Sequence, residues 1–142
     1  LLDEQFPLNS GLAFSIPDHP EEGRDNGLLQ AWEIFEQVRL DADLVTLSAC
    51  DTGLGKEMGG EGLVGLVRAF QFAGARSVLA SLWSVSDDST ALLMKRFYTY
   101  LRQGKTKDEA LRGAQLDLIH SEKDKLSHPY HWAGFALYGD WR

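Results

Sequence analysis

The chain has 142 residues, of which 44% are hydrophobic and 25% charged, proportions typical of a globular domain. A chain of this length buries roughly two-thirds of its surface on folding, so we expect one domain with its own core and no metal or disulfide support. Fourteen basic residues stand against 21 acidic ones, which gives a formal net charge of −7. Since the basic residues are also scattered, this balance disfavours nucleic acid as a partner.

The sequence also excludes two cellular settings. No hydrophobic run approaches the ~18 to 20 residues that span a membrane, and no signal-peptide pattern opens the chain, so we expect neither a membrane nor a secreted protein. The single cysteine, Cys50, cannot form an internal disulfide, which indicates the reducing cytoplasm. Because Leu1 stands where a start methionine would be, we interpret the chain as a piece of a longer protein.

The first part of the chain is rich in turn-forming residues. One short hydrophobic run, 11–16, can form a strand. Hydrophobic residues then recur every three or four positions over 28–38, which predicts a short amphipathic helix. Residues 44–50, with the sequence LVTLSAC, are a nearly continuous β-favouring run and predict a strand buried on both faces. A glycine-rich loop, 51–60, follows.

The next segment completes a βαβ unit. A helix is expected from Leu63, with Gly74 placed to end it. Its buried face is expected to carry Leu63, Leu66, Val67 and Phe70. Residues 77–83 predict a second buried strand. Strand, helix and strand in such close succession predict two parallel strands joined by a right-handed crossover.

Two further helices and a strand are predicted. The first helix follows Ser86, its expected N-cap, and ends before Gly104. Its buried face is expected to carry Leu93, Phe97 and Leu101. The second opens with a capping box from Thr106 to Glu109. Its buried face is expected to carry Ala110, Leu111, Ala114 and Leu118. An aromatic tail then predicts a last strand at 135–138.

Two segments with reactive or charged side chains are expected at one edge of the sheet. Ligands of an open parallel sheet bind beyond the carboxyl ends of its strands, where Cys50 and the segment 83–88 would both lie. A cysteine attacks as the thiolate, and backbone N–H groups of the glycine-rich loop could lower its pKa from about 8.5 and hold an oxyanion. The alternative is a buried cysteine that packs as a small hydrophobic residue.

A thiolate nucleophile also needs a general base, commonly histidine. The histidines are His19, His120, His128 and His131. None has a sequence position that places it beside Cys50. His128 and His131 lack a second pair of ligands for zinc, so we expect no metal and interpret them as packing and hydrogen-bonding residues.

The glycine-rich loop matches no nucleotide-binding motif. A P-loop needs Ser or Thr after its Gly-Lys pair, but Gly55-Lys56 is followed by Glu57. A dinucleotide-binding fingerprint needs glycine where Met58 stands. We therefore expect no cofactor, and a nucleotide-dependent switch domain is disfavoured.

Several motifs in order resemble the CHAT domain, a family of caspase-like and separase-like peptidase domains often joined to tetratricopeptide repeats. The motifs are LSACDTG at 47–53, GEGL at 60–63, RAF at 68–70, AGA at 73–75, SLWSV at 81–85, HPY at 128–130, WA at 132–133, and Gly139. The resemblance covers nearly the whole chain from about Ser10 onward.

The resemblance implies a caspase-like α/β/α sandwich with a mainly parallel sheet, and a cysteine endopeptidase with a Cys-His dyad. The family's nucleophile is the cysteine of its Ser-Ala-Cys motif, which corresponds to Cys50. The family's histidine belongs to a His-Gly motif upstream of the segment matching 10–16, so none of the four histidines here receives that role. Residues 1–142 are then the C-terminal portion of one CHAT domain, incomplete at its N-terminal side and inactive alone. The upstream half, tetratricopeptide repeats and a protein substrate are the expected partners.

Substrate preference is predicted from charge. Asp51 and Asp87 are candidates for pairing with a basic residue before the scissile bond, with Trp83 as a wall of the pocket. The alternative for Asp87 and Asp88 is that they stabilise only the helix they begin. The alternative for the whole domain is a catalytically inactive CHAT-like scaffold or signalling module.

Overall fold

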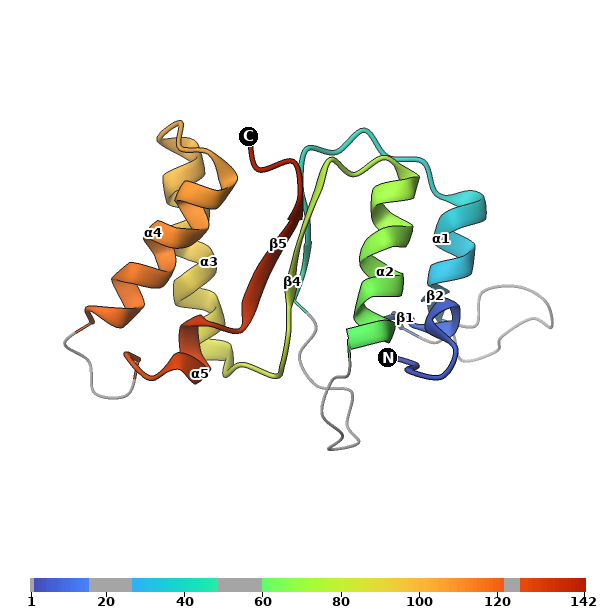
Figure 1. The fold of residues 1–142 in the computed structure, drawn as a ribbon, viewed down its shortest axis with the longest axis horizontal. Coiled ribbons are helices and arrows are strands. Elements are labelled where there is room, and N and C mark those ends of the chain that lie inside the picture. The colour runs from blue at the N-terminus through green and yellow to red at the C-terminus, as the bar shows by residue number, and fades with distance from the viewer. Residues whose placement is uncertain (1, 16–26, 49–59, 122–125) are drawn as a thin grey trace. The chain divides into compact units, whose positions relative to one another are not determined.

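The computed structural model describes residues 2–15, 27–48, 60–121 and 126–142 (Figure 1). The chain divides into two compact units. Unit 1 comprises Leu1–Val45 and Thr52–Arg76, and unit 2 comprises Thr46–Asp51 and Ser77–Arg142. Both contain helices and strands, so the predicted α/β class is confirmed.

The described residues of unit 1 form two helices and a small antiparallel sheet. The 3-10 turn η1 (Pro7–Asn9) leads into β1 (Gly11–Ala13), which pairs with β2 (Leu28–Gln30). Helix α1 (Ala31–Gln37) packs against α2 (Gly60–Ala73). The predicted strand at 11–16 is therefore shorter, and its last residue lies outside the described residues.

The prediction of one helix over 28–38 is wrong in its first turn. Residues Leu28 to Gln30 form β2, and the helix begins at Ala31. The Gln30 backbone N–H donates to the Glu33 carboxylate at 2.8 Å, which satisfies a donor that would otherwise be unpaired at the helix start. Pairing with β1 supplies hydrogen bonds for the preceding residues, so their helical periodicity is overridden by a partner distant in sequence.

Helix α2 confirms the predicted buried face, since Leu63, Leu66, Val67 and Phe70 are all buried. It begins at Gly60 and ends before Gly74, which has φ +117°. The Leu40 N–H donates to the Ala73 carbonyl at 2.7 Å, so the segment after α1 runs directly over this helix end. A Cβ atom on Gly74 would collide with the Leu40 backbone.

Replacing Gly74 with alanine is expected to lower the free energy of unfolding by about 1 to 3 kcal/mol, because both φ and the Leu40 contact oppose a side chain. Urea unfolding followed by circular dichroism measures the loss. Gly104→Ala is the matched control, since Gly104 has φ +85° and nothing within 4 Å of its added Cβ. Equal losses in the two variants would mean that the Leu40 contact adds nothing.

Unit 2 contains most of a three-stranded sheet in the order β3-β4-β5. All five residues of β4 (Ser77–Ser81) are buried, as predicted. The strand is shorter than the predicted 77–83, because Leu82 and Trp83 lie after its end and are half-buried. Strand β3 (Val45–Leu47) is shorter than the predicted 44–50, and its first two residues are half-buried, so burial on both faces is wrong for them. Its expected last residues, 49 and 50, lie outside the described residues.

The pairing of β4 with β5 (Phe135–Gly139) is antiparallel, with Ser77 opposite Gly139. Pairing of β1 with β2 is antiparallel too, whereas Ala42 and Ala75 form an isolated parallel bridge. These registers therefore do not confirm the predicted, mainly parallel sheet. The connection between β4 and β5 explains their antiparallel direction. After two long helices the chain is back at the end of the sheet where β4 finishes, so β5 starts there and runs the opposite way (Figure 1).

Those helices are α3 (Asp87–Arg102) and α4 (Lys107–Ile119), which pack against each other. Both predicted starts are confirmed: Ser86 is the N-cap residue of α3, and the Thr106 N–H donates to the Glu109 carboxylate at 3.4 Å. Ser86 makes no side-chain cap bond, however. The buried predictions hold for Leu93, Phe97, Ala110, Leu111, Ala114 and Leu118. Leu101 is half-buried.

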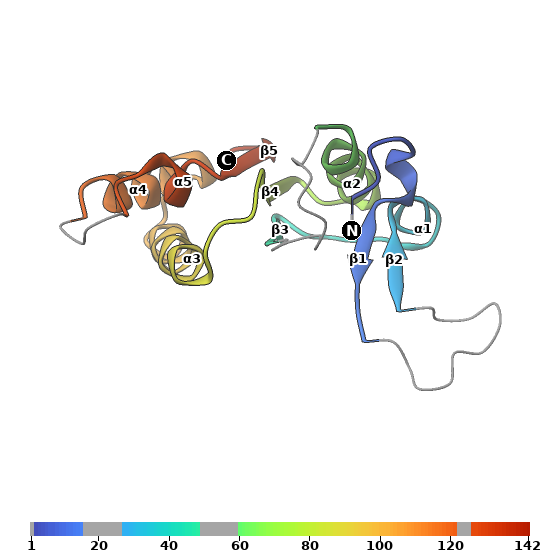
Figure 2. The same ribbon diagram turned by 90° about the horizontal axis from the view of Figure 1, so that it is seen from below.

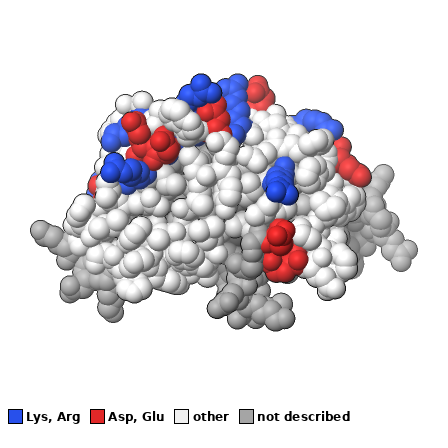
Figure 3. Space-filling model, viewed as in Figure 1, with Lys and Arg blue, Asp and Glu red and all other residues white. Residues whose placement is uncertain are grey.

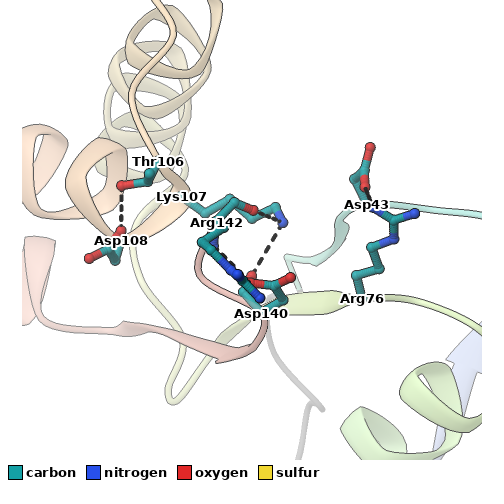
Figure 4. Close-up of polar contacts among 7 residues, drawn as sticks. All are labelled: Asp43, Arg76, Thr106, Lys107, Asp108, Asp140 and Arg142. Carbon is teal, nitrogen blue, oxygen red and sulfur yellow. Dashed lines mark hydrogen bonds and ion pairs between the residues drawn. The ribbon is translucent and has the colours of Figure 1, made fainter.

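Lys107 forms hydrogen bonds to the segment that follows β5, residues 140–142 (Figure 4). Its side chain is buried, and Nζ donates to the backbone carbonyls of Asp140 at 3.2 Å and Arg142 at 2.6 Å. Its N–H donates to the Trp141 carbonyl at 2.9 Å. Hydrogen bonds from the Arg142 backbone and side chain lower the pKa of the Asp140 carboxyl. The whole segment is thus tied to the first turn of α4.

Candidate functional site

The loop 82–86 joins β4 to α3 and carries one of the four predicted site residues, and a second follows directly after it. Trp83 lies in the loop and is half-buried, while Asp87 is exposed as the first residue of α3. Cys50 and Asp51 lie outside the described residues, so their predicted roles stay predictions.

This loop is held by a short helix that sequence reasoning had not connected with it. Helix α5 (Pro129–Trp132) contacts both α3 and α4 (Figures 1 and 2). The Trp83 indole Nε1 donates to the Tyr130 carbonyl at 3.1 Å, and the Tyr130 hydroxyl donates to the Ser84 carbonyl at 2.5 Å. The Leu82 N–H donates to the Gly134 carbonyl at 2.6 Å. Three successive loop residues are therefore bonded to the segment 130–134.

A second set of bonds joins α5 to the first turn of α3. The Ser89 hydroxyl, which is 1% exposed, lies 2.7 Å from His131 Nδ1. It also lies 2.7 Å from the Ser86 hydroxyl. Serine and histidine can each donate or accept here, so the chain of bonds closes whichever tautomer His131 adopts.

The two imidazoles next to α5 have structural partners. His128 Nδ1 accepts the Tyr130 N–H at 3.2 Å and caps the helix, and His131 bonds to Ser89. The interpretation of both as hydrogen-bonding residues is confirmed. Among residues 2–15, 27–48, 60–121 and 126–142, no three His, Cys, Asp or Glu side chains are arranged to hold a metal ion.

The electrostatic character of the loop comes from the start of α3. Asp87 and Asp88 are both exposed in its first turn, where the helix dipole favours negative charge. On the face seen in Figure 3, basic side chains are interspersed with acidic ones. Within the described part of the chain, no helix is long and apolar enough to cross a bilayer.

Comparison with known protein families identifies the kind of domain in which the loop 82–86 lies. The sequence model of the CHAT domain family matches residues 1–140. The chain belongs to the CHAT domain family. The predicted resemblance is thereby confirmed, and the loop 82–86 with Trp83 falls within a CHAT domain.

Two curated proteins are similar to this CHAT domain. Tetratricopeptide repeat protein 28 of Mus musculus is 38% identical over 112 residues, and that of Homo sapiens is 36% identical over the same length. Each match covers 79% of this chain and 4% of the relative. The chain thus spans a small part of the length of these relatives.

Tyr130 and Gly134 are the residues that sequence reasoning missed. A Cβ on Gly134 would lie 2.6 Å from Val85 Cγ2 and 3.1 Å from Trp83 Nε1, so a side chain has no room there. The available signal was the HPY motif at 128–130, which matched the CHAT family without indicating a contact. Its partners lie more than forty positions away, beyond the reach of local patterns.

Proposed function

We propose that this CHAT domain is the C-terminal portion of a cysteine endopeptidase with Cys50 as its nucleophile. The observation that carries the proposal is the family match over residues 1–140, within which the Ser-Ala-Cys motif stands at 48–50. Members of the family are related to caspase-like peptidases. A caspase-like α/β/α sandwich with a mainly parallel sheet, completed by upstream residues, is part of the same proposal.

The proposed reaction is acyl transfer. The Cys50 thiolate attacks the scissile carbonyl carbon, forming an S–C bond while the C–N bond breaks, and the leaving amine takes its proton from an imidazolium. Water then hydrolyses the thioester, returning the thiol and releasing the carboxylic acid. In the family's pattern the general base belongs to a His-Gly motif upstream of the segment matching 10–16, so we propose that sequence upstream of this chain supplies it.

The first test is the pH dependence of Cys50 alkylation, measured by peptide mass spectrometry. We expect a thiolate well below the reference pKa of about 8.5 in a protein extended upstream through the adjoining strand and loop, and ordinary titration in residues 1–142 alone. Replacing the upstream histidine with alanine is the control and should restore ordinary titration. Ordinary titration in both proteins would contradict the peptidase and favour the inactive scaffold.

A basic residue before the scissile bond is the proposed specificity. Asp87 supports it because it is exposed at the start of α3, four positions after Trp83 in the chain, and a carboxylate can form a charged hydrogen bond to Arg or Lys. Asp51 is the second proposed carboxylate. Trp83 offers its half-buried indole as a wall along which the aliphatic part of a basic side chain can lie.

Asp87→Asn is expected to lower kcat/KM for Arg and Lys substrates about 10- to 100-fold, the effect of losing one charged hydrogen bond. Steady-state cleavage of matched peptides by the upstream-extended protein measures this loss. Asp88→Asn is the matched control, because it removes the same charge from the same helical turn. Equal losses in both variants would mean that the carboxylates act only on the helix.

The names of the relatives suggest the wider context. Since the two curated relatives are tetratricopeptide repeat proteins, we propose that such repeats accompany this domain and present a protein substrate to it in the cytoplasm. Co-purification of the separately expressed repeats and CHAT domain tests this arrangement.

A further inference from the structure

We propose that α5 is the positioning element of the substrate loop, and that Tyr130 and His131 are positioning residues for Trp83 and Asp87. The inference rests on the proposed function in so far as the loop 82–86 binds substrate. Its structural part, that α5 fixes this loop, is tested independently of cleavage.

Tyr130 holds two successive loop residues. Its backbone carbonyl accepts the Trp83 indole N–H at 3.1 Å, while its hydroxyl donates to the Ser84 carbonyl at 2.5 Å. The indole bond orients the ring, and the carbonyl bond fixes the backbone next to it. Tyr130 is itself 44% exposed, so its contribution is the pair of bonds more than burial of its ring.

His131 holds the helix that begins with Asp87. Its Nδ1 lies 2.7 Å from the Ser89 hydroxyl, which belongs to the same first turn of α3 as Asp87. Residues within one helical turn keep a fixed spacing, so holding Ser89 in place also holds the backbone of Asp87 in place. The Ser86–Ser89 bond extends this restraint back into the loop.

The backbone after α5 closes the arrangement from one side. The Gly134 carbonyl accepts the Leu82 N–H at 2.6 Å, and its Cα leaves no space for a side chain against Val85 and Trp83. The side chains of Val85 and Trp83 therefore pack directly against the backbone at Gly134, and this close packing leaves Trp83 little freedom to change rotamer.

Helix α5 is in turn held by its neighbours. It has a single turn, too short to be stable alone. The Gln115 amide from α4 donates to the Trp132 carbonyl at 3.2 Å, and the Trp132 indole donates to the Ser127 carbonyl at 3.0 Å. The loop that would meet substrate is thus anchored through α5 to α4.

Hydrogen–deuterium exchange of the full-length protein tests the structural part. Tyr130→Phe and His131→Ala are expected to speed exchange in peptides covering 82–90 at least severalfold, because both release bonds that hold this segment. Tyr100→Phe is the matched control: it breaks a tyrosine hydroxyl bond to Asp117 between α3 and α4, and should leave these peptides unchanged. Unchanged exchange in Tyr130→Phe and His131→Ala would overturn the inference.

Kinetics then tests the consequence for substrate. Tyr130→Phe and His131→Ala are expected to raise KM for basic peptides about fivefold, the effect of one neutral hydrogen bond, with the rate of Cys50 alkylation unchanged. His131→Asn should restore KM, because its amide oxygen can replace Nδ1 as the partner of Ser89. A fall in kcat and alkylation with KM unchanged would overturn a positioning role. Absence of cleavage by the unsubstituted protein would contradict the proposed function, while exchange at 82–90 would still decide the role of α5.

Discussion

Replacing Phe97 with alanine is expected to lower the free energy of unfolding by about 3 to 5 kcal/mol, because a fully buried aromatic side chain leaves a cavity behind. Phe97 is 0% exposed, as is Leu93 one turn earlier on α3. The adjacent Tyr98 ring meets it edge to face at a centroid distance of 5.2 Å, and this contact is lost as well.

Urea unfolding followed by circular dichroism, with exchange of α3 peptides as a second readout, measures the Phe97 effect. The second readout matters because the chain has two compact units, and a chain with more than one unit need not unfold in a single two-state transition. Phe14→Ala is the matched control: this phenylalanine is 59% exposed, and its removal should change stability by less than about 0.5 kcal/mol. Equal unfolding midpoints for Phe97→Ala and the unsubstituted chain would contradict the packing of α3.

The second large effect is expected at Lys107. Its replacement by methionine keeps the aliphatic chain but removes the donor shared by the Asp140 and Arg142 carbonyls. Hydrogen bonds to charged groups contribute about 1.5 to 3 kcal/mol, and here a buried ammonium makes two, so we expect a loss of about 2 to 4 kcal/mol.

The same unfolding experiment measures the Lys107→Met loss, and hydrogen exchange should quicken in β5, whose following segment is released. Lys95→Met on α3 is the control, because Lys95 is exposed and its loss should cost less than about 0.5 kcal/mol. Unchanged exchange in β5 would mean that the hydrogen bonds of Lys107 do not stabilise the strand.

Local signals explain which elements could be predicted. The start of α4 followed from Thr106 and Glu109, three positions apart, and the end of α3 from Gly104, which has φ +85°. Capping and glycine conformation act within one turn and are therefore visible in sequence. The start of α1 was missed because Leu28 to Gln30 pair with β1, a partner that periodicity does not reveal.

Long-range geometry explains the rest. The antiparallel direction of β5 depends on how α3 and α4 stack, and no residue within 135–139 encodes it. Trp83 and Asp87 were identified from their place after a strand, which the structure retains. Tyr130 was missed because its bonds to the loop exist only once β5 has brought α5 beside it. The role of Cys50 stays a prediction.

The pairing of β4 with β5 also bears on biosynthesis. Strand β4 is fully buried, yet α3, α4 and α5 must all be translated before β5 leaves the ribosome. Because synthesis proceeds at about 5 to 20 residues per second, the edge of β4 that pairs with β5 stays unpaired for several seconds. An apolar strand with an open edge is a template for pairing with another nascent chain. Until β5 is complete, this edge of β4 is therefore where we expect pairing with a neighbouring nascent chain to begin.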